Sequence, residues 1–196
     1  KLINKTKRLL EIPKEYKVVG NIANLLEIKD PFTFLRMAEL VKETIPETFF
    51  LWVGEGGQQQ KQIEKIAHRM GLEGSFKITG FIPHDNIPGI LAVFDVFVNT
   101  SKIEVVPLSL LEAQAAEKPI VSSEFLGVED VISDGKTGFT FPIGNAEEAA
   151  NLVIKLLLNE NEASLMGNNA LKYFQSKRSS PATMAKMYSD VYEDLV

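Results

Sequence analysis

The chain has 196 residues, of which 45% are hydrophobic and 24% charged, a composition typical of a folded globular protein. It has no cysteine and two histidines, His68 and His84, which excludes disulfides and cysteine chemistry and argues against a zinc site or any other metal site. With 21 basic and 26 acidic residues we expect no nucleic-acid binding. Without a signal peptide or a membrane-spanning run, we expect a cytoplasmic protein, peripheral to a membrane only through a longer parent.

Positive charge is concentrated in the first 17 residues, which hold six basic and two acidic side chains. The whole chain, by contrast, has a formal net charge of −5 at pH 7. We interpret residues 1–15 as a basic, solvated linker, and a phosphate- or membrane-binding patch is the alternative. The chain begins with Lys1 rather than methionine, which suggests a processed product or an excised part of a longer protein.

After this segment, short apolar runs alternate with stretches of helical periodicity. In chain order we predict strand 16–23, helix 31–43, strand 48–53, helix 58–70, strand 76–79, helix 87–91, strand 93–98, a helix beginning at Pro107, strands 119–122 and 138–141, and helices 146–158, 163–177 and 181–195. The alternation predicts an α/β fold: a Rossmann-like, doubly wound parallel sheet with helices on both faces. We assign residues 16–160 to this domain and 161–196 to a helical C-terminal tail.

The loop and helix after the fourth strand carry two acidic residues, Glu104 and Glu112. Pro107 suits the first helical position, and the next three amides would then face the cleft, where the positive end of the helix favours an anion such as phosphate. These amides belong to Leu108, Ser109 and Leu110. Glu112 leans toward the same cleft and could accept hydrogen bonds from both ribose hydroxyls, and Glu104 could hold hydroxyls of a sugar. Alternatively, Glu104 is a solvated loop residue and Glu112 faces water.

The spacing Glu104-x7-Glu112, followed by EKPIVS at 117–122 and DGKTGF at 134–139, resembles the "group 1" family of retaining glycosyltransferases. In particular, it is similar to the C-terminal, nucleotide-sugar-binding domain of their two-domain GT-B architecture. Other similar segments are VVGNIAN at 18–24, KDP at 29–31, LWVGEG at 51–56, GFIP at 80–83 and FDVFV at 94–98. The resemblance covers residues 16–158.

The resemblance implies roles for individual residues. Lys29 matches the lysine that contacts the donor diphosphate, and Asn24 stands where the family usually has an arginine with the same role. Glu104 matches the glutamate near the donor sugar, and Glu112 the one that holds the ribose. Lys29 and Glu104 would be the catalytic residues. The remaining candidates for nucleotide binding are Gly54, Phe81, Ile82, Pro107, Leu108 and Ser109.

The resemblance also implies a function. We expect retaining, metal-independent transfer of a sugar from a UDP- or GDP-sugar to an acceptor, without a cofactor. The GT-B architecture has an N-terminal acceptor-binding domain for which this chain has no residues, so we expect a fragment that is inactive alone. Two alternatives stay open: a degenerate, non-catalytic binding module, motivated by Asn24 and by Val105-Val106 where the family has glycine, and a GT-B-fold sugar-nucleotide epimerase.

Overall fold

A computed structural model describes residues 2–105 and 107–177 of the chain; Val106 and the predicted helix 181–195 lie outside the described residues. Six strands form one parallel sheet in the order β3-β2-β1-β4-β5-β6. The strands are β1 (Lys17–Ile22), β2 (Thr48–Val53), β3 (Phe76–Ile78), β4 (Val96–Asn99), β5 (Ile120–Ser123) and β6 (Phe139–Phe141). The chain therefore moves outward from β1 to β3 and then returns to the other side of β1 for β4.

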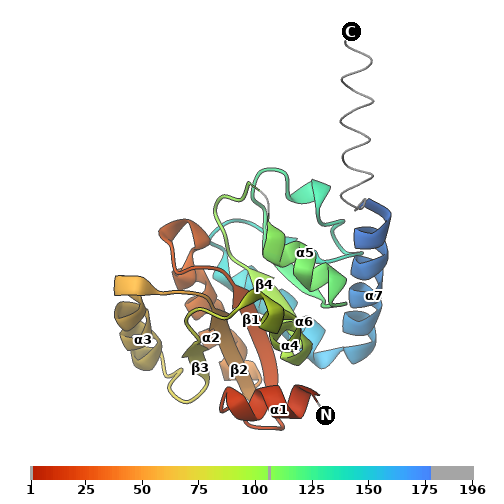
Figure 1. Ribbon diagram of the computed structural model, residues 1–196. Coiled ribbons are helices and arrows are strands. Elements are labelled where there is room, and N and C mark those ends of the chain that lie inside the picture. The colour runs from red at the N-terminus through yellow and green to blue at the C-terminus, as the bar shows by residue number, and fades with distance from the viewer. Residues whose placement is uncertain (1, 106, 178–196) are drawn as a thin grey trace.

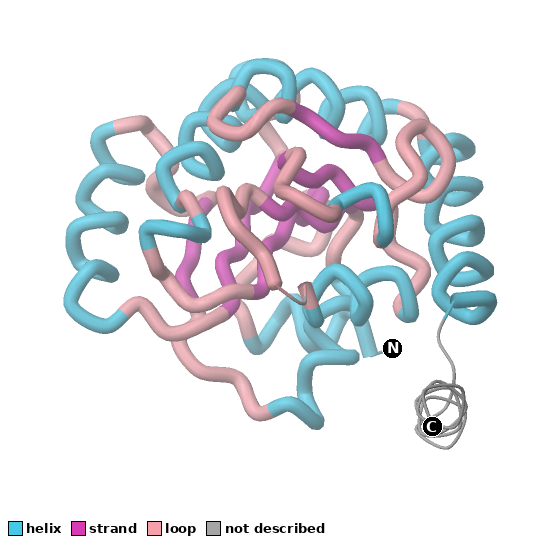
Figure 2. The backbone as a smooth tube through the Cα atoms, turned by 90° about the horizontal axis from the view of Figure 1, so that it is seen from above, coloured by secondary structure: helices cyan, strands magenta, loops and turns pink. Residues whose placement is uncertain are grey.

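Helices cover both faces of the sheet, as Figures 1 and 2 show. They are α1 (Leu2–Leu9), α2 (Pro31–Thr44), α3 (Gln60–Arg69), α4 (Ile87–Val93), α5 (Leu108–Ala115), α6 (Ala146–Leu158) and α7 (Glu160–Lys177). Phe34 of α2, Ile63 of α3 and Val153 of α6 belong to one buried cluster. Ile90 of α4 and Leu110 of α5 belong to a second cluster. These two clusters lie on opposite faces, and the predicted doubly wound α/β fold is confirmed.

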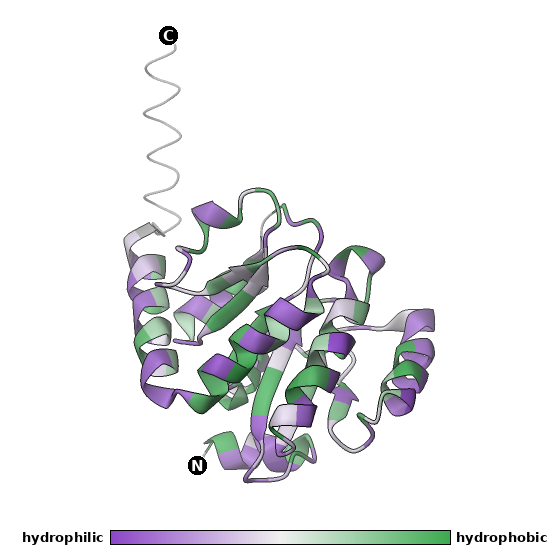
Figure 3. Cartoon of the chain, turned by 180° about the vertical axis from the view of Figure 1, so that it is seen from behind, coloured by the Kyte–Doolittle hydropathy of each residue, from purple (hydrophilic) through white to green (hydrophobic). Residues whose placement is uncertain are grey.

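The interior of the sheet is apolar because parallel strands are covered on both sides (Figure 3). Every residue of β2 is buried. Trp52, the single tryptophan of the chain, meets the Phe34 ring edge to face with 5.3 Å between ring centroids. Its indole nitrogen donates a 2.6 Å hydrogen bond to the carbonyl of Ala23, just after β1. The core thus contacts directly the first residue of the loop that follows β1.

The fourth strand is shorter than predicted. The apolar run 93–98 was expected to be extended throughout, but Val93 ends α4 and β4 begins at Val96. Between them, the Asp95 carboxylate accepts a 2.7 Å hydrogen bond from the Val18 amide at the start of β1. This contact with a distant strand fixes a connection that a local apolar pattern does not indicate.

The segment 1–15, expected to be a solvated linker, contains the helix α1. Its Lys7 ammonium donates hydrogen bonds to the carbonyls of Lys14 and Tyr16, at 3.1 and 2.6 Å. The helix also contacts α4, at the lower edge in Figure 1. Leu2 and Leu9 remain 58% and 69% exposed, so apolar burial contributes little to this helix.

The described part of the predicted tail 161–196 belongs to α7. This helix begins at Glu160 rather than 163, and Met166 and Ala170 are buried against the domain. Among the described residues no helix is long and apolar enough to cross a membrane.

Candidate functional site

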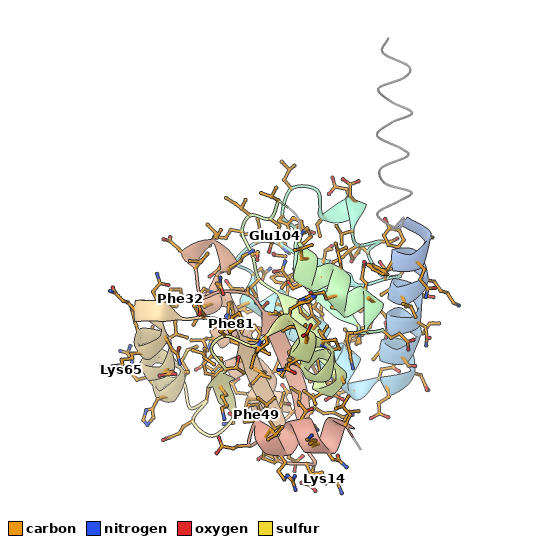
Figure 4. All side chains as sticks on the ribbon, in the orientation of Figure 1. Lys14, Phe32, Phe49, Lys65, Phe81 and Glu104 are labelled. Atoms are coloured by element: carbon orange, nitrogen blue, oxygen red, sulfur yellow. The ribbon has the colours of Figure 1, made fainter. Side chains whose placement is uncertain are left out.

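The carboxyl ends of β1 and β4 lie side by side where the strand order reverses. In doubly wound sheets, ligands bind outside this point, between the loops that leave the two strands. The loop after β1 carries Lys29, and the loop after β4 carries Glu104. Figure 4 shows Glu104 above the beginning of α5, at the end of the molecule opposite Lys14. The topology therefore brings together two residues that the sequence analysis singled out.

The Lys29 loop ends in a fixed turn. Residues Glu27–Lys29 form a short 3-10 helix, and Asp30 follows with a left-handed backbone (φ 48°). The Asp30 carboxylate accepts hydrogen bonds from the Thr33 hydroxyl at 2.7 Å and from the Thr33 amide at 3.3 Å. Asp30 thereby caps the first turn of α2, which begins with Pro31.

Further hydrogen bonds join this turn to the loop after β4. The buried Thr100 hydroxyl lies 2.8 Å from the Lys29 carbonyl and 3.0 Å from the Asp30 carbonyl. The Lys102 amide donates to the Ile28 carbonyl at 2.7 Å. Thr100 was not singled out from the sequence; the polar triplet Asn99-Thr100-Ser101 at the end of a buried strand was the available signal. The two loops are thus held together by the Thr100 side chain and by a backbone hydrogen bond.

Lys29 and Glu104 form an ion pair across these loops. The Lys29 Nζ atom lies 2.8 Å from Oε1 and 2.7 Å from Oε2 of Glu104. The side chains are only 20% and 9% exposed, respectively. The alternative interpretation of Glu104 as a solvated loop residue is therefore wrong. A cation and a carboxylate in contact at this edge can bind a ligand that carries both an anionic group and hydroxyl donors.

The beginning of α5 differs from the prediction in two respects. The helix begins at Leu108, and Pro107 is its N-cap rather than its first residue. The Pro107 carbonyl accepts hydrogen bonds from the amides of Leu110, at 3.0 Å, and Leu111, at 3.2 Å. The Leu110 amide was expected to face the cleft and is instead satisfied within the helix. For the amides of Leu108 and Ser109, no acceptor is found in the part of the chain that the structure describes.

Glu112 lies in the second turn of α5, apart from the Lys29–Glu104 pair. Its side chain is 29% exposed, and Oε1 lies 3.5 Å from Nδ1 of His84, which is itself 84% exposed. With Leu91 and Ala115, Glu112 lines a pocket of about 540 Å³ between α4 and α5. It therefore does not simply face water, but no contact joins it to Lys29 or Glu104 among the described residues. His84 is largely exposed, and its contact with Glu112 is an ion pair only when the imidazole is protonated.

Burial raises the pKa of Glu112 above the ordinary carboxyl value, and His84 partly opposes this effect when protonated. The folded protein then binds this proton more tightly than the unfolded chain. Consequently the free energy of unfolding falls as pH rises from the ordinary carboxyl pKa through the raised one.

We therefore expect Glu112→Gln to raise the midpoint of thermal unfolding slightly at neutral pH and to leave it unchanged at acidic pH, where Glu112 is already protonated. Thermal unfolding followed by circular dichroism at both pH values checks this. The matched control is Glu73→Gln, because Glu73 also lies beside a histidine, His68, but is 76% exposed. A lower midpoint for Glu112→Gln at neutral pH would contradict the burial argument.

Asn24 and Gly54 lie in the loops that follow β1 and β2. Asn24 is exposed, and its Oδ1 atom accepts a 3.3 Å hydrogen bond from the Glu55 amide. Asn24, Glu55 and Gly56 line a pocket of about 370 Å³. At Gly54 the backbone has φ 146°, and an added Cβ would lie 2.2 Å from the Ala23 carbonyl oxygen. Glycine is therefore required at position 54 by the close approach of two backbones.

Phe81 and Ile82 follow β3 at the same edge. The side chain of Phe81 is 70% exposed, whereas Ile82 is partly buried against the core cluster beneath α4 and α5. A backbone bridge between Gly54 and Gly80 holds this loop beside the loop after β2. Exposed aromatic surface here is available to stack on a planar ligand.

The candidate residues thus form three groups: the Lys29–Glu104 pair with the start of α5, Glu112 with His84 beside the pocket between α4 and α5, and Asn24 with Gly54 and the Phe81 loop. Within residues 2–105 and 107–177, no cluster of three or more histidine or acidic side chains could hold a metal ion.

Comparison with known proteins identifies the family. Residues 3–173 match the model of the family described as "Glycosyl transferases group 1". The chain belongs to the group 1 glycosyl transferases. The family expected from the glutamate spacing is confirmed.

Curated relatives that are named glycosyltransferases extend beyond this chain. A D-inositol 3-phosphate glycosyltransferase of Corynebacterium urealyticum is 25% identical over 195 residues, which are 96% of this chain and 46% of that protein. A poly(ribitol-phosphate) alpha-N-acetylglucosaminyltransferase of Staphylococcus aureus is 28% identical over 178 residues, 89% of this chain and 36% of that protein. The chain thus spans less than half the length of both relatives.

Solved structures show the same fold. A mutant of S. aureus TarM in complex with Fondaparinux, alpha-GlcNAc-glycerol and UDP superimposes with a TM-score of 0.80 at 25% identity, covering 90% of this chain and 36% of TarM. The C-terminal domain of the group 1 protein LpcC from Francisella tularensis has a TM-score of 0.80 at 20% identity, and the match covers 88% of this chain and 91% of that domain. The chain therefore has the fold of a C-terminal GT-B domain.

Proposed function

We propose that this chain binds the donor substrate, a nucleoside-diphosphate sugar, for a retaining glycosyltransferase. The observation that carries the proposal is the Lys29–Glu104 pair at the reversal point of the sheet. Lys29 supplies a cation for the diphosphate, and Glu104 supplies an acceptor for hydroxyl groups of the donor sugar.

The leaving group in such a transfer is a diphosphate, so negative charge grows on it in the transition state. The Lys29 ammonium and the amides of Leu108 and Ser109 stabilise this charge electrostatically, which makes a metal ion unnecessary in the proposal. Glu112 accepts hydrogen bonds from the ribose, and Asn24, Gly54, Phe81, Ile82 and Pro107 line the remainder of the donor site. The acceptor attacks from the face that the leaving group vacates, which retains the anomeric configuration.

The comparisons support donor binding as this chain's part of the reaction. The TarM complex named above contains UDP, and TarM is 25% identical to this chain over the matched region. Because the chain spans 46% of the inositol-phosphate relative, we propose that further residues of a parent protein bind the acceptor. The isolated chain then transfers sugar slowly or not at all.

The test is a thermal-unfolding panel with UDP, GDP, UDP-glucose and GDP-mannose. A ligand that binds only the folded state at about 100 times its Kd stabilises the protein by roughly 2.7 kcal/mol, or about 5–11 °C in a domain of this size. Uridine and guanosine, which lack the diphosphate, serve as controls and should shift the midpoint far less. If none of the four nucleotides protects the protein, donor binding is excluded and the non-catalytic binding module takes its place.

A further inference from the structure

The Lys29–Glu104 pair neutralises the cation on which diphosphate binding depends. Both carboxylate oxygens of Glu104 lie within 2.8 Å of the Lys29 Nζ atom, so two of the three ammonium donors are directed at Glu104. Among the described residues no other ion pair involves either side chain. A phosphate that approaches Lys29 therefore also approaches a carboxylate of the same charge sign as its own.

The two side chains are not free to move far apart. The Thr100 hydroxyl and the Lys102 amide hold the backbone of the Lys29 turn against the loop that carries Glu104. With Glu104 only 9% exposed, water has little access to its carboxylate. If Lys29 turns to a ligand, the Glu104 carboxylate loses its partner in a poorly solvated place, which is unfavourable.

A sugar changes this balance. Hydroxyl groups are hydrogen-bond donors and can replace the ammonium at the Glu104 oxygens, whereas a bare diphosphate has only acceptors to offer. A sugar-bearing donor thus satisfies both members of the pair, and the nucleoside diphosphate product satisfies only Lys29.

We infer that Glu104 is a specificity-determining residue: by competing for Lys29, it sets the preference of the site for the sugar-bearing donor over the bare nucleoside diphosphate. This inference rests on the proposed function and adds to it a selection against product. Release of the nucleoside diphosphate after transfer is favoured by the return of Lys29 to Glu104.

The test measures the Kd of the best nucleoside diphosphate from the panel, and of its hexose conjugate, by isothermal titration calorimetry. Glu104→Gln keeps the shape but removes the charge, and we expect it to bind the bare diphosphate about 5- to 10-fold more tightly than wild type. The ratio of donor affinity to diphosphate affinity should fall by at least the same factor. Loss of a merely structural contact would weaken both ligands together and leave this ratio unchanged.

Two further variants sharpen the result. Glu27→Gln removes one exposed negative charge from the same 3-10 turn as Lys29 and should change diphosphate affinity less than about twofold, because exposed charges are screened by salt. Glu104→Asp keeps the charge on a shorter side chain, so its Kd for the nucleoside diphosphate should remain closer to the wild-type value than that of Glu104→Gln. It provides the comparison if the glutamine variant fails to fold.

The outcomes separate the two proposals. If the wild type binds neither the nucleoside diphosphates nor their sugar conjugates, the proposed function fails and this inference fails with it. If the wild type binds and Glu104→Gln binds the diphosphate no more tightly, or Glu27→Gln gains as much, only the role of Glu104 is overturned.

Discussion

Replacing Lys29 with methionine is expected to weaken nucleoside diphosphate binding by roughly 30-fold, or about 2 kcal/mol, the size of a hydrogen bond to a charged group. Lys29 supplies the one ammonium that lies against Glu104 among the described residues, at the reversal point of the sheet. Methionine keeps the unbranched side chain but offers no donor. Calorimetric titration with the preferred diphosphate measures the loss.

The control for Lys29→Met is Lys102→Met, which removes an exposed cation from the neighbouring loop. It should change the Kd less than about twofold, since exposed charges are screened by salt. Lys29→Arg keeps a cation and should retain more affinity than Lys29→Met. A folded Lys29→Met protein with wild-type affinity, or an equal loss in Lys102→Met, would refute the assigned role of Lys29.

Gly54→Ala is expected to destabilise the fold by about 3 kcal/mol, which lowers the midpoint of thermal unfolding by roughly 6–12 °C. The backbone at Gly54 has φ 146°, and the new methyl group would lie 2.2 Å from the carbonyl oxygen of Ala23. Since that atom belongs to the backbone after β1, a rotamer change cannot relieve the clash. Thermal unfolding without ligand measures the effect.

The matched control for Gly54→Ala is Gly57→Ala in the same loop. Gly57 also has a positive φ, 49°, but an added Cβ meets nothing within 4 Å. Gly57→Ala should therefore lower the free energy of unfolding by only about 1 kcal/mol, the penalty for placing a residue with a side chain in the left-handed backbone conformation. Equal losses for the two variants would mean that the contact with Ala23 is not the cause.

Where hydrophobic periodicity was strong and local, the elements could be predicted from the sequence. The bounds of β2 and α6 agree with the prediction to the residue. The predicted element bounds are wrong where contacts between residues distant in the sequence fix the local backbone. Val93 ends α4 two residues before Asp95, whose carboxylate accepts a hydrogen bond from the distant Val18 amide, and Lys7 of α1 donates hydrogen bonds to a later turn.

Topology explains how far the site could be predicted. Because Lys29 and Glu104 each follow a strand, a parallel sheet places them at one edge, but spacing cannot say that they touch. The proximity of His84 to Glu112 likewise depends on how α4 and α5 pack, and Thr100 acts through backbone carbonyls that no residue pattern identifies. The roles of the individual residues toward a nucleotide remain predictions.

The position of Trp52 gives the protein an intrinsic optical probe. It is the single tryptophan of the chain, and its side chain is fully buried. Its hydrogen bond to the Ala23 carbonyl connects it to the start of the Lys29 loop. Fluorescence excited selectively through tryptophan therefore reports from one known place, without an attached dye. Its emission is sensitive both to loss of the core and to rearrangement of the neighbouring loop, so the two processes can be followed in one cuvette.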